Sequence, residues 1–214
     1  MIFEGKKFEE INQADLENLI AFQFREGKFV DYKREPSLAK PLDKKEFLAD
    51  VSSFANTSGG HLLIGMEENN GVPTAISPIN LNNPDQEIAR LDHLSGAGIR
   101  PRIYGLKIHP VKIGEKYVLV IRVPKSWQGL HMITFDGHDR FYGRNSHGKY
   151  PLDVEEIRGA FSLFESGYDR IRNFRADRIA KIIGNVELPV ETKENLAKGV
   201  LHIIPFSMIE RYDN

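Results

Sequence analysis

The sequence predicts an α/β (α+β) fold, a mixed β-sheet with packed helices. Patterns typical of helices and of strands alternate in the first part of the chain, and strand patterns dominate the part that follows. Residues 43–66 give the clearest signal, an amphipathic helix that leads through two glycines into a strand with apolar residues on both faces. This order of elements favours helices lying on one mixed sheet, and not a doubly wound parallel sheet.

The N-terminal part is expected to contain three helices and two strands. Asn12 is a suitable N-cap for the first helix. Asp43 and Glu46 have the spacing of a capping box at the start of the second helix, which ends at a pair of glycines. In chain order we expect a helix at residues 12–22, a strand at 28–33, a helix at 43–57, a strand at 61–66, a turn at 67–71 and a helix at 84–94.

Strands are expected to dominate the middle of the chain, and helices return towards its end. Asp136-Gly137 marks a turn between two short strands, and Asp153 is a suitable cap for the next helix. The expected strands are at 103–109, 116–123, 131–135 and 140–143, with a hairpin turn at 112–115, followed by helices at 153–164 and 169–183 and a strand at 200–204. We expect a first domain at 1–165 and a helix-strand subregion at 166–214 that starts a further domain of a longer protein.

Composition excludes several classes of protein. With 41% hydrophobic residues, the 214-residue chain can bury a sizeable core. The absence of cysteine excludes disulfides, thiolate zinc sites and cysteine nucleophiles. No apolar run approaches the ~20 residues that cross a bilayer, and the charged N-terminus lacks a signal-peptide core, so we expect a cytoplasmic protein with no membrane partner. The formal net charge of −1 means that any nucleic-acid site is a local patch.

The most informative motif is FANTSGGHLLIG, at residues 54–65. Its asparagine and threonine can bond to nearby backbone groups at the end of the helix. Its glycines permit a close approach of another backbone or of a phosphate. These residue types also suit an ordinary helix-to-strand connection. Five residues are candidates for a structural role in the motif: Asn56, Thr57, Gly59, Gly60 and Gly65.

This motif resembles the signature of the Schlafen AlbA_2 domain family, in which a helix is followed by AFANT-x-GG and by a strand that ends in glycine and acidic residues. Upstream, REGKFVDYK resembles the family's Glu-x4-Glu-Phe-Lys segment. Downstream, VIRVPKSWQGLH, FYGRNSHGKYPLDVEEIRGAF and YDRIRNFRADRIAKI agree with the family in order and spacing. The resemblance covers about residues 15–206 and implies a Schlafen AlbA_2-like fold that handles nucleic acid.

The resemblance also implies an acidic site. By position it assigns catalytic and metal-binding roles to Glu26, Asp31 and Glu68, and Lys33 joins the catalytic set because it shares a strand face with Asp31. Such carboxylates suit Mg²⁺ or Mn²⁺, which would activate water against a phosphodiester. Asp31 and Glu68 each differ by a methylene from the residue usual in the family, which puts cleavage in doubt. Acidic residues are also ordinary at element ends, and Asp31-Tyr32-Lys33 alternatively resembles a half-motif of restriction-endonuclease-like enzymes.

Basic residues supply the candidate contacts to nucleic acid. Residues 140–149 combine cations for phosphates, an aromatic ring for a base and small polar donors. Residues 169–181 carry five basic residues against two acidic ones on a predicted helix, which can follow a phosphate backbone. Both patterns also suit solvated surfaces. The candidate nucleic-acid-binding residues are Arg140, Tyr142, Arg144, Asn145, Ser146, Lys149, Arg172 and Arg175.

Three functions are compatible with these patterns. The first is a DNA- or RNA-binding module of a regulator or defence protein. The second is a metal-dependent endonuclease, with RNA favoured over DNA, that uses the three carboxylates. The third, an ATP- or small-molecule-binding domain, is disfavoured because the chain lacks a Gly-x4-Gly-Lys-Ser/Thr phosphate loop. We expect binding rather than cleavage; the choice between DNA and RNA stays open, as does the oligomeric state, a homo-oligomer included.

Overall fold

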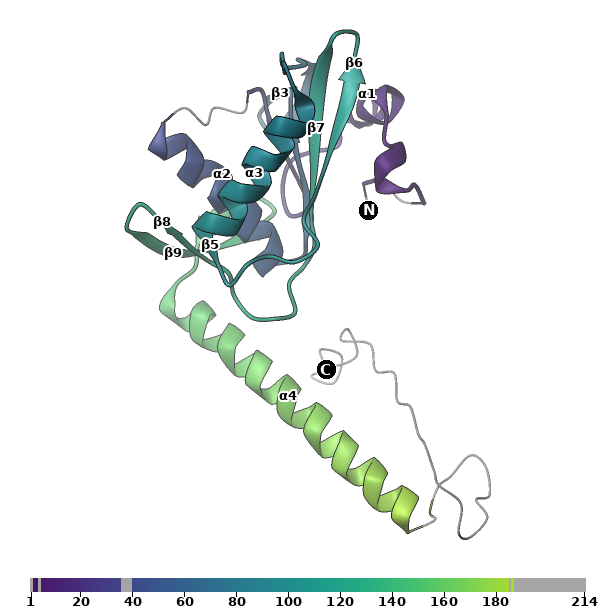
Figure 1. Cartoon of the computed structure of the whole chain (residues 1–214), viewed down its shortest axis with the longest axis vertical. Helices are drawn as coiled ribbons and strands as arrows, with labels where there is room; N and C mark the ends of the chain where they lie inside the picture. The colour runs from purple at the N-terminus through teal and green to yellow at the C-terminus, as the bar shows by residue number, and fades with distance from the viewer. Residues whose placement is uncertain (1, 4, 36–39, 185, 187–214) are drawn as a thin grey trace. The chain divides into compact units, whose positions relative to one another are not determined.

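The computed structural model describes residues 2–3, 5–35, 40–184 and 186, so the strand expected at 200–204 lies outside the described residues (Figure 1). By its internal contacts the chain divides into two compact units, residues 1–157 and 158–214. The first unit contains every strand of the described part and its first three α-helices. The domain boundary expected at residue 166 stays a prediction.

The described part of the chain contains helices and strands, and its strands pair in both parallel and antiparallel orientation. The helices are η1 (Phe8–Glu10, a single 3₁₀ turn), α1 (Gln13–Ala21), α2 (Pro41–Asn56), α3 (Pro84–Gly98) and α4 (Val154–Ile183). The strands are β1 (Val30–Lys33), β2 (Gly60–Ile64), β3 (Met66–Asn69), β4 (Val72–Ile76), β5 (Ile99–Arg100), β6 (Lys107–Ile113), β7 (Lys116–Val123), β8 (Met132–Phe135), β9 (His138–Asn145) and β10 (Gly148–Pro151). The predicted α/β (α+β) class is confirmed.

The central sheet has the strand order β1-β2-β7-β6. β1 runs parallel to β2, whereas β7 is antiparallel to both β2 and β6, so the sheet is mixed, as predicted. One core cluster includes Phe54 of α2 and Leu62 of β2, and the other includes Leu16 of α1 and Leu63 of β2. Because successive side chains of a strand point to opposite faces, β2 is covered on both sides. Its expected place in the interior of the sheet is confirmed.

A second sheet, of order β10-β9-β8-β5, packs against α2 through β8 and β9. Asp136 and Gly137 both have positive φ and join β8 to β9, where the turn was expected. The single turn expected at 67–71 is wrong, because β3 and β4 form a hairpin of their own there. Asn70 and Gly71 between them have φ of 52° and 77°, the left-handed pair that a two-residue hairpin needs.

The strand and helix starts also differ from expectation. The strand expected at 103–109 is β6, which begins at Lys107. α2 begins at Pro41, and Asp43 lies inside its first turn, where its carboxylate accepts a hydrogen bond from the Lys40 backbone N–H at 3.2 Å. Proline suits the first helical position because it has no N–H to leave unpaired.

The two helices expected at 153–164 and 169–183 are one continuous helix, α4. A glycine inside a helix costs only about 1 kcal/mol, which the surrounding helix formers offset. The start of α4 is as expected, because the Glu156 backbone N–H donates to the Asp153 carboxylate at 2.8 Å. Within the described residues, no helix combines the length and the apolar character needed to cross a membrane.

Candidate functional site

The alternation of β1 directs two charged residues towards α2. Val30 and Tyr32 belong to the core on the α1 side of the sheet. Asp31 and Lys33 therefore point to the opposite face, where α2 lies. Asp31 is 5% exposed, so its carboxylate is almost fully removed from water. A charge in such a place requires partners.

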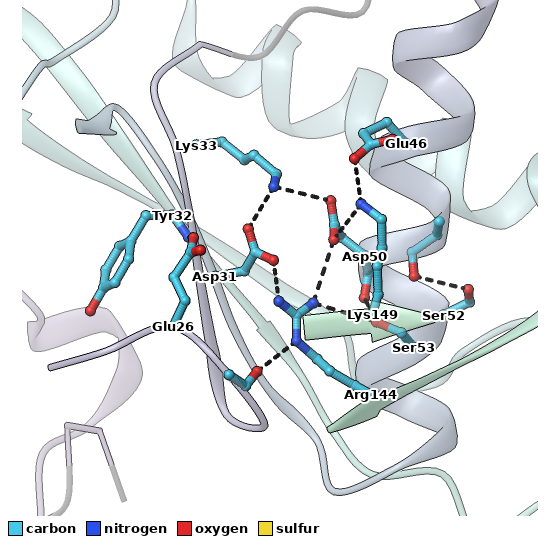
Figure 2. Close-up of polar contacts among 12 residues, drawn as sticks. Glu26, Asp31, Tyr32, Lys33, Glu46, Asp50, Ser52, Ser53, Arg144 and Lys149 are labelled. Carbon is cyan, nitrogen blue, oxygen red and sulfur yellow. Dashed lines mark hydrogen bonds and ion pairs between the residues drawn. The ribbon is translucent and has the colours of Figure 1, made fainter. Parts of the chain in front are cut away.

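Arg144 of β9 is the main partner of Asp31 (Figure 2). Its Nη2 donates to the Asp31 carboxylate, its Nε donates to the Gly27 carbonyl oxygen at 2.7 Å, and its Nη1 lies 3.4 Å from an Asp50 oxygen. The guanidinium carbon lies 4.2 Å from the centroid of the Phe54 ring. Arg144 thus joins β9 to β1, to α2 and to the loop before β1.

Asp50 of α2 completes a buried ion-pair cluster, which we define as Asp31, Lys33, Asp50, Arg144 and Lys149. The Lys149 ammonium lies 2.8 Å from one Asp50 oxygen and also 2.6 Å from Glu46 at the cluster's edge. The Lys33 ammonium lies 2.7 Å from Asp31 and 3.8 Å from the other Asp50 oxygen. Two buried carboxylates are therefore surrounded by three cations.

The pKa shifts in the cluster follow from burial opposed by ion pairing. Burial alone would raise the pKa of Asp31, but Arg144 and Lys33 hold it below its usual value. Burial, aided by the charge of Asp31, raises the pKa of Asp50 despite the nearby lysines. Burial would lower the pKa of Lys33, yet Asp50 and Asp31 raise it. The positive charge of Lys33 is therefore stabilised by the two carboxylates beside it.

The other two predicted catalytic acids lie beside the cluster, not within it. The Glu26 carboxylate accepts a hydrogen bond from the Tyr32 backbone N–H at 2.6 Å, and the Glu26 backbone N–H donates to the Gly71 carbonyl oxygen. Glu68 accepts from the Gly71 backbone N–H. Burial and the charge of Asp31 raise the pKa of Glu26 to about 7. Both glutamates thus fasten the loop before β1 and the β3–β4 turn.

Each of these three acids is engaged by other groups of the protein. Among the described residues, no three His, Asp or Glu side chains are grouped so that they could hold a metal ion. Asp31 is paired with Arg144 and Lys33, while Glu26 and Glu68 bond to backbone N–H groups. Mg²⁺ and Mn²⁺ need carboxylate oxygens that are directed at one point. The metal-binding role of Glu26, Asp31 and Glu68 stays a prediction.

The predicted nucleic-acid contacts divide into buried and exposed residues. Arg144 is 3% exposed and paired inside the protein, so its expected role as a phosphate contact is corrected. Lys149 is mostly covered and paired with Asp50 and Glu46. The Tyr142 side chain packs against the core on the α2 side. The exposed members are Arg140, Asn145 and Ser146 in the first unit and Arg172 and Arg175 in the second.

Asn56 and Thr57 connect the end of α2 to the second sheet. The Asn56 amide donates to the carbonyl oxygens of His131 and Tyr142, and its oxygen accepts from the His131 N–H at 2.7 Å. The Thr57 hydroxyl accepts from the Arg144 backbone N–H at 3.0 Å. The sequence predicted bonds to nearby backbone at the helix end; these bonds reach distant strands instead and place Arg144 over α2.

The glycines of the motif are required by close packing. A Cβ at Gly59, which has φ of 70°, would lie 2.7 Å from the Lys125 backbone nitrogen. A Cβ at Gly60 would lie 2.4 Å from the Phe54 ring. Gly65 directly follows β2, and its N–H donates to the Lys33 carbonyl oxygen at 2.7 Å. The close approach expected at these glycines is made by protein atoms.

Asp50 is the member of the buried ion-pair cluster that the sequence did not predict. It is 1% exposed in a segment of α2 that is buried from Phe47 to Ala55. A lone acidic residue within the apolar part of a helix was a usable signal, because a buried carboxylate is rarely found without a cationic partner. The partner itself, on β9, could not be read from the helix.

The chain is similar to proteins of known structure. Two solved structures resemble it. One is the DIP2311 protein from Corynebacterium diphtheriae, with 21% identity and a TM-score of 0.47. The other is the N-terminal domain of a protein from Nitrosomonas europaea named "putative ATP-dependent DNA helicase RecG-related protein", with 24% identity and a TM-score of 0.37. The alignments cover 67% and 52% of this chain, and 27% and 71% of the respective relatives. None of the curated proteins matches the sequence.

The family match covers the whole of the site. Residues 26–153 match the family described as Schlafen, AlbA_2. The matched segment makes up more than half of the 214-residue chain. The matched segment begins at Glu26 and contains the buried ion-pair cluster, the residue 54–65 motif and the β9–β10 hairpin. The chain therefore belongs to the Schlafen AlbA_2 family.

Proposed function

We propose that this chain is a nucleic-acid-binding module that does not use a three-carboxylate metal site. The pairing of Asp31 with Arg144 and Lys33 is the observation that carries this proposal. A nuclease of the expected kind needs the Asp31 carboxylate for its metal ion, and here two cations already neutralise it. Membership of the AlbA_2 family supports the nucleic-acid role.

Exposed cations outside the cluster support binding. Arg140 on β9 is exposed, as are Arg172 and Arg175 on α4. Exposed guanidinium groups can replace the counterions of phosphates without disturbing the buried ion-pair cluster. Because the formal net charge is −1, we expect modest affinity that depends strongly on salt.

Fluorescence anisotropy with labelled RNA and DNA oligonucleotides at several salt concentrations tests the proposal. We expect binding at low salt that weakens as salt rises, together with intact oligonucleotides after incubation with Mg²⁺, Mn²⁺ or EDTA. Cleavage that requires a divalent ion and is lost in Asp31→Asn would overturn the proposal in favour of a nuclease. Absence of binding to every nucleic acid at low salt would contradict the nucleic-acid role itself.

A further inference from the structure

Two segments that are distant in sequence meet beside the buried ion-pair cluster. A Cβ at Gly27 would lie 3.1 Å from the Ser146 carbonyl oxygen, so the loop before β1 touches the β9–β10 turn at this point. The Arg144 Nε donates to the Gly27 carbonyl oxygen at 2.7 Å and so stabilises the same contact from the buried ion-pair cluster. The loop and the turn therefore lie next to each other.

The loop is held by its backbone, which leaves two side chains on the outside. The Gly27 N–H donates to the Val30 carbonyl oxygen at 3.0 Å, and the Phe29 carbonyl oxygen accepts from the His61 N–H at 2.9 Å. Lys28 is exposed and Phe29 is 43% exposed. The Lys28 ammonium lies 5.7 Å from the centroid of the Phe29 ring. A cation and an aromatic ring thus stand together on a fixed loop.

The neighbouring β9–β10 turn contributes polar groups. Asn145, Ser146 and His147 are all exposed. The Asn145 side-chain oxygen accepts from the His147 backbone N–H at 2.8 Å, and the Ser146 hydroxyl lies 3.3 Å from the His147 ring nitrogen. These bonds order the turn, while the Asn145 amide nitrogen and the far side of the His147 ring can still face a ligand.

We propose that Lys28, Phe29, Asn145, Ser146 and His147 form a surface that binds single-stranded nucleic acid. Phe29 stacks on an unpaired base, Lys28 pairs with an adjacent phosphate, and the turn donates hydrogen bonds to the backbone. A duplex keeps its bases stacked on one another, so an exposed ring of this kind gains little from it. This inference rests on the proposed nucleic-acid role and adds the ligand class and the contact residues.

Anisotropy with a labelled single-stranded RNA, the matching DNA strand and their duplexes tests this surface. We expect the wild-type protein to prefer single strands. Phe29→Ala should weaken single-strand binding by about tenfold, as loss of one base–aromatic stack does elsewhere, and should leave duplex binding unchanged. Phe29→Leu keeps the apolar volume without the ring and should show a loss of similar size. Lys28→Ala should weaken binding most at low salt.

Matched controls are an exposed lysine and an exposed aromatic residue elsewhere in the first unit, Lys116→Ala and Tyr104→Ala. Circular dichroism verifies that each variant is folded. Binding that Phe29→Leu leaves unchanged, or an equal loss in the controls, would overturn the surface while leaving the proposed function intact. A preference for duplex would also overturn it. Absence of binding to any nucleic acid by the wild type would instead contradict the proposed function.

Discussion

Arg144 and Arg172 were both expected to contact phosphate, yet their surroundings are opposite. The Arg144 side chain is 1% exposed and bonds to groups of β1, α2 and the loop before β1. The Arg172 side chain is 79% exposed and pairs with Asp169, one turn earlier on α4, at 3.4 Å. A buried arginine must be matched by buried acceptors, whereas an exposed pair of this kind is worth about 0–1 kcal/mol and is easily exchanged for a ligand. Solvent exposure therefore separates structural cations from cations that can bind.

The largest effect is expected from Arg144→Ala. It would leave Asp31 and Asp50 buried near each other with less cationic compensation, so the free energy of unfolding should fall by about 3–5 kcal/mol. Urea unfolding measures this change. Arg140→Ala, four residues earlier on the same strand and exposed, is the matched control and should change stability by less than about 0.5 kcal/mol. Equal, small effects of both substitutions would remove the distinction between the two kinds of arginine.

A smaller loss is expected from Asn56→Ala. The substitution removes three hydrogen bonds to the backbone of His131 and Tyr142. Because those backbone groups then lack partners, the free energy of unfolding should fall by about 1–3 kcal/mol in total. Thermal unfolding tests this, with exposed Asn145→Ala as the control. A loss no greater than that of the control would mean that Asn56 does not hold the second sheet on α2.

Glu26 should give a measurable pH dependence of stability. Its pKa is about 7 in the folded protein against a usual 4.5, so the folded protein binds a proton between these values that the unfolded chain releases. The free energy of unfolding should therefore fall as pH rises through this window. His61, whose pKa burial and Arg122 lower to about 4, acts in the opposite sense between pH 4 and 6.5.

The difference between wild type and Glu26→Gln cancels the contribution of His61. The glutamine keeps an acceptor for the Tyr32 N–H, so we expect the wild type to lose stability relative to this variant from pH 5 to pH 8. Chemical denaturation at several pH values supplies the comparison. A difference that is constant with pH would show that Glu26 is not protonated in the folded protein near neutrality.

The smallest effect is expected from Arg172→Ala and Arg175→Ala on α4. Both side chains are exposed, so each substitution should change the free energy of unfolding by less than about 0.5 kcal/mol. Thermal unfolding of the single and double variants measures this. A loss of several kcal/mol would place these arginines with Arg144 as structural cations.

The sequence was sufficient for the fold class and for the interior place of β2 because the deciding signals are local. The apolar residues of β2 on both faces, the stripe on α2 and the cap at Asn12 each depend on a few neighbouring residues. The residue 54–65 motif also identified the family. The roles of Arg144 and Asp50 depend on a contact between β9 and α2, which neighbouring residues do not encode. The charges of FYGRNSHGK gave no sign that its arginine, Arg144, faces inward.

The most direct test compares Lys28→Ala with Lys149→Ala in the salt dependence of binding to single strands. Lys28 is exposed, whereas Lys149 pairs with Asp50 and Glu46. We expect Lys28→Ala to reduce the slope of log Kd against log salt by about 0.7, the value for one phosphate contact. Lys149→Ala should lower the stability of the protein and leave the slope unchanged. A slope that falls with Lys149→Ala and not with Lys28→Ala would contradict the account.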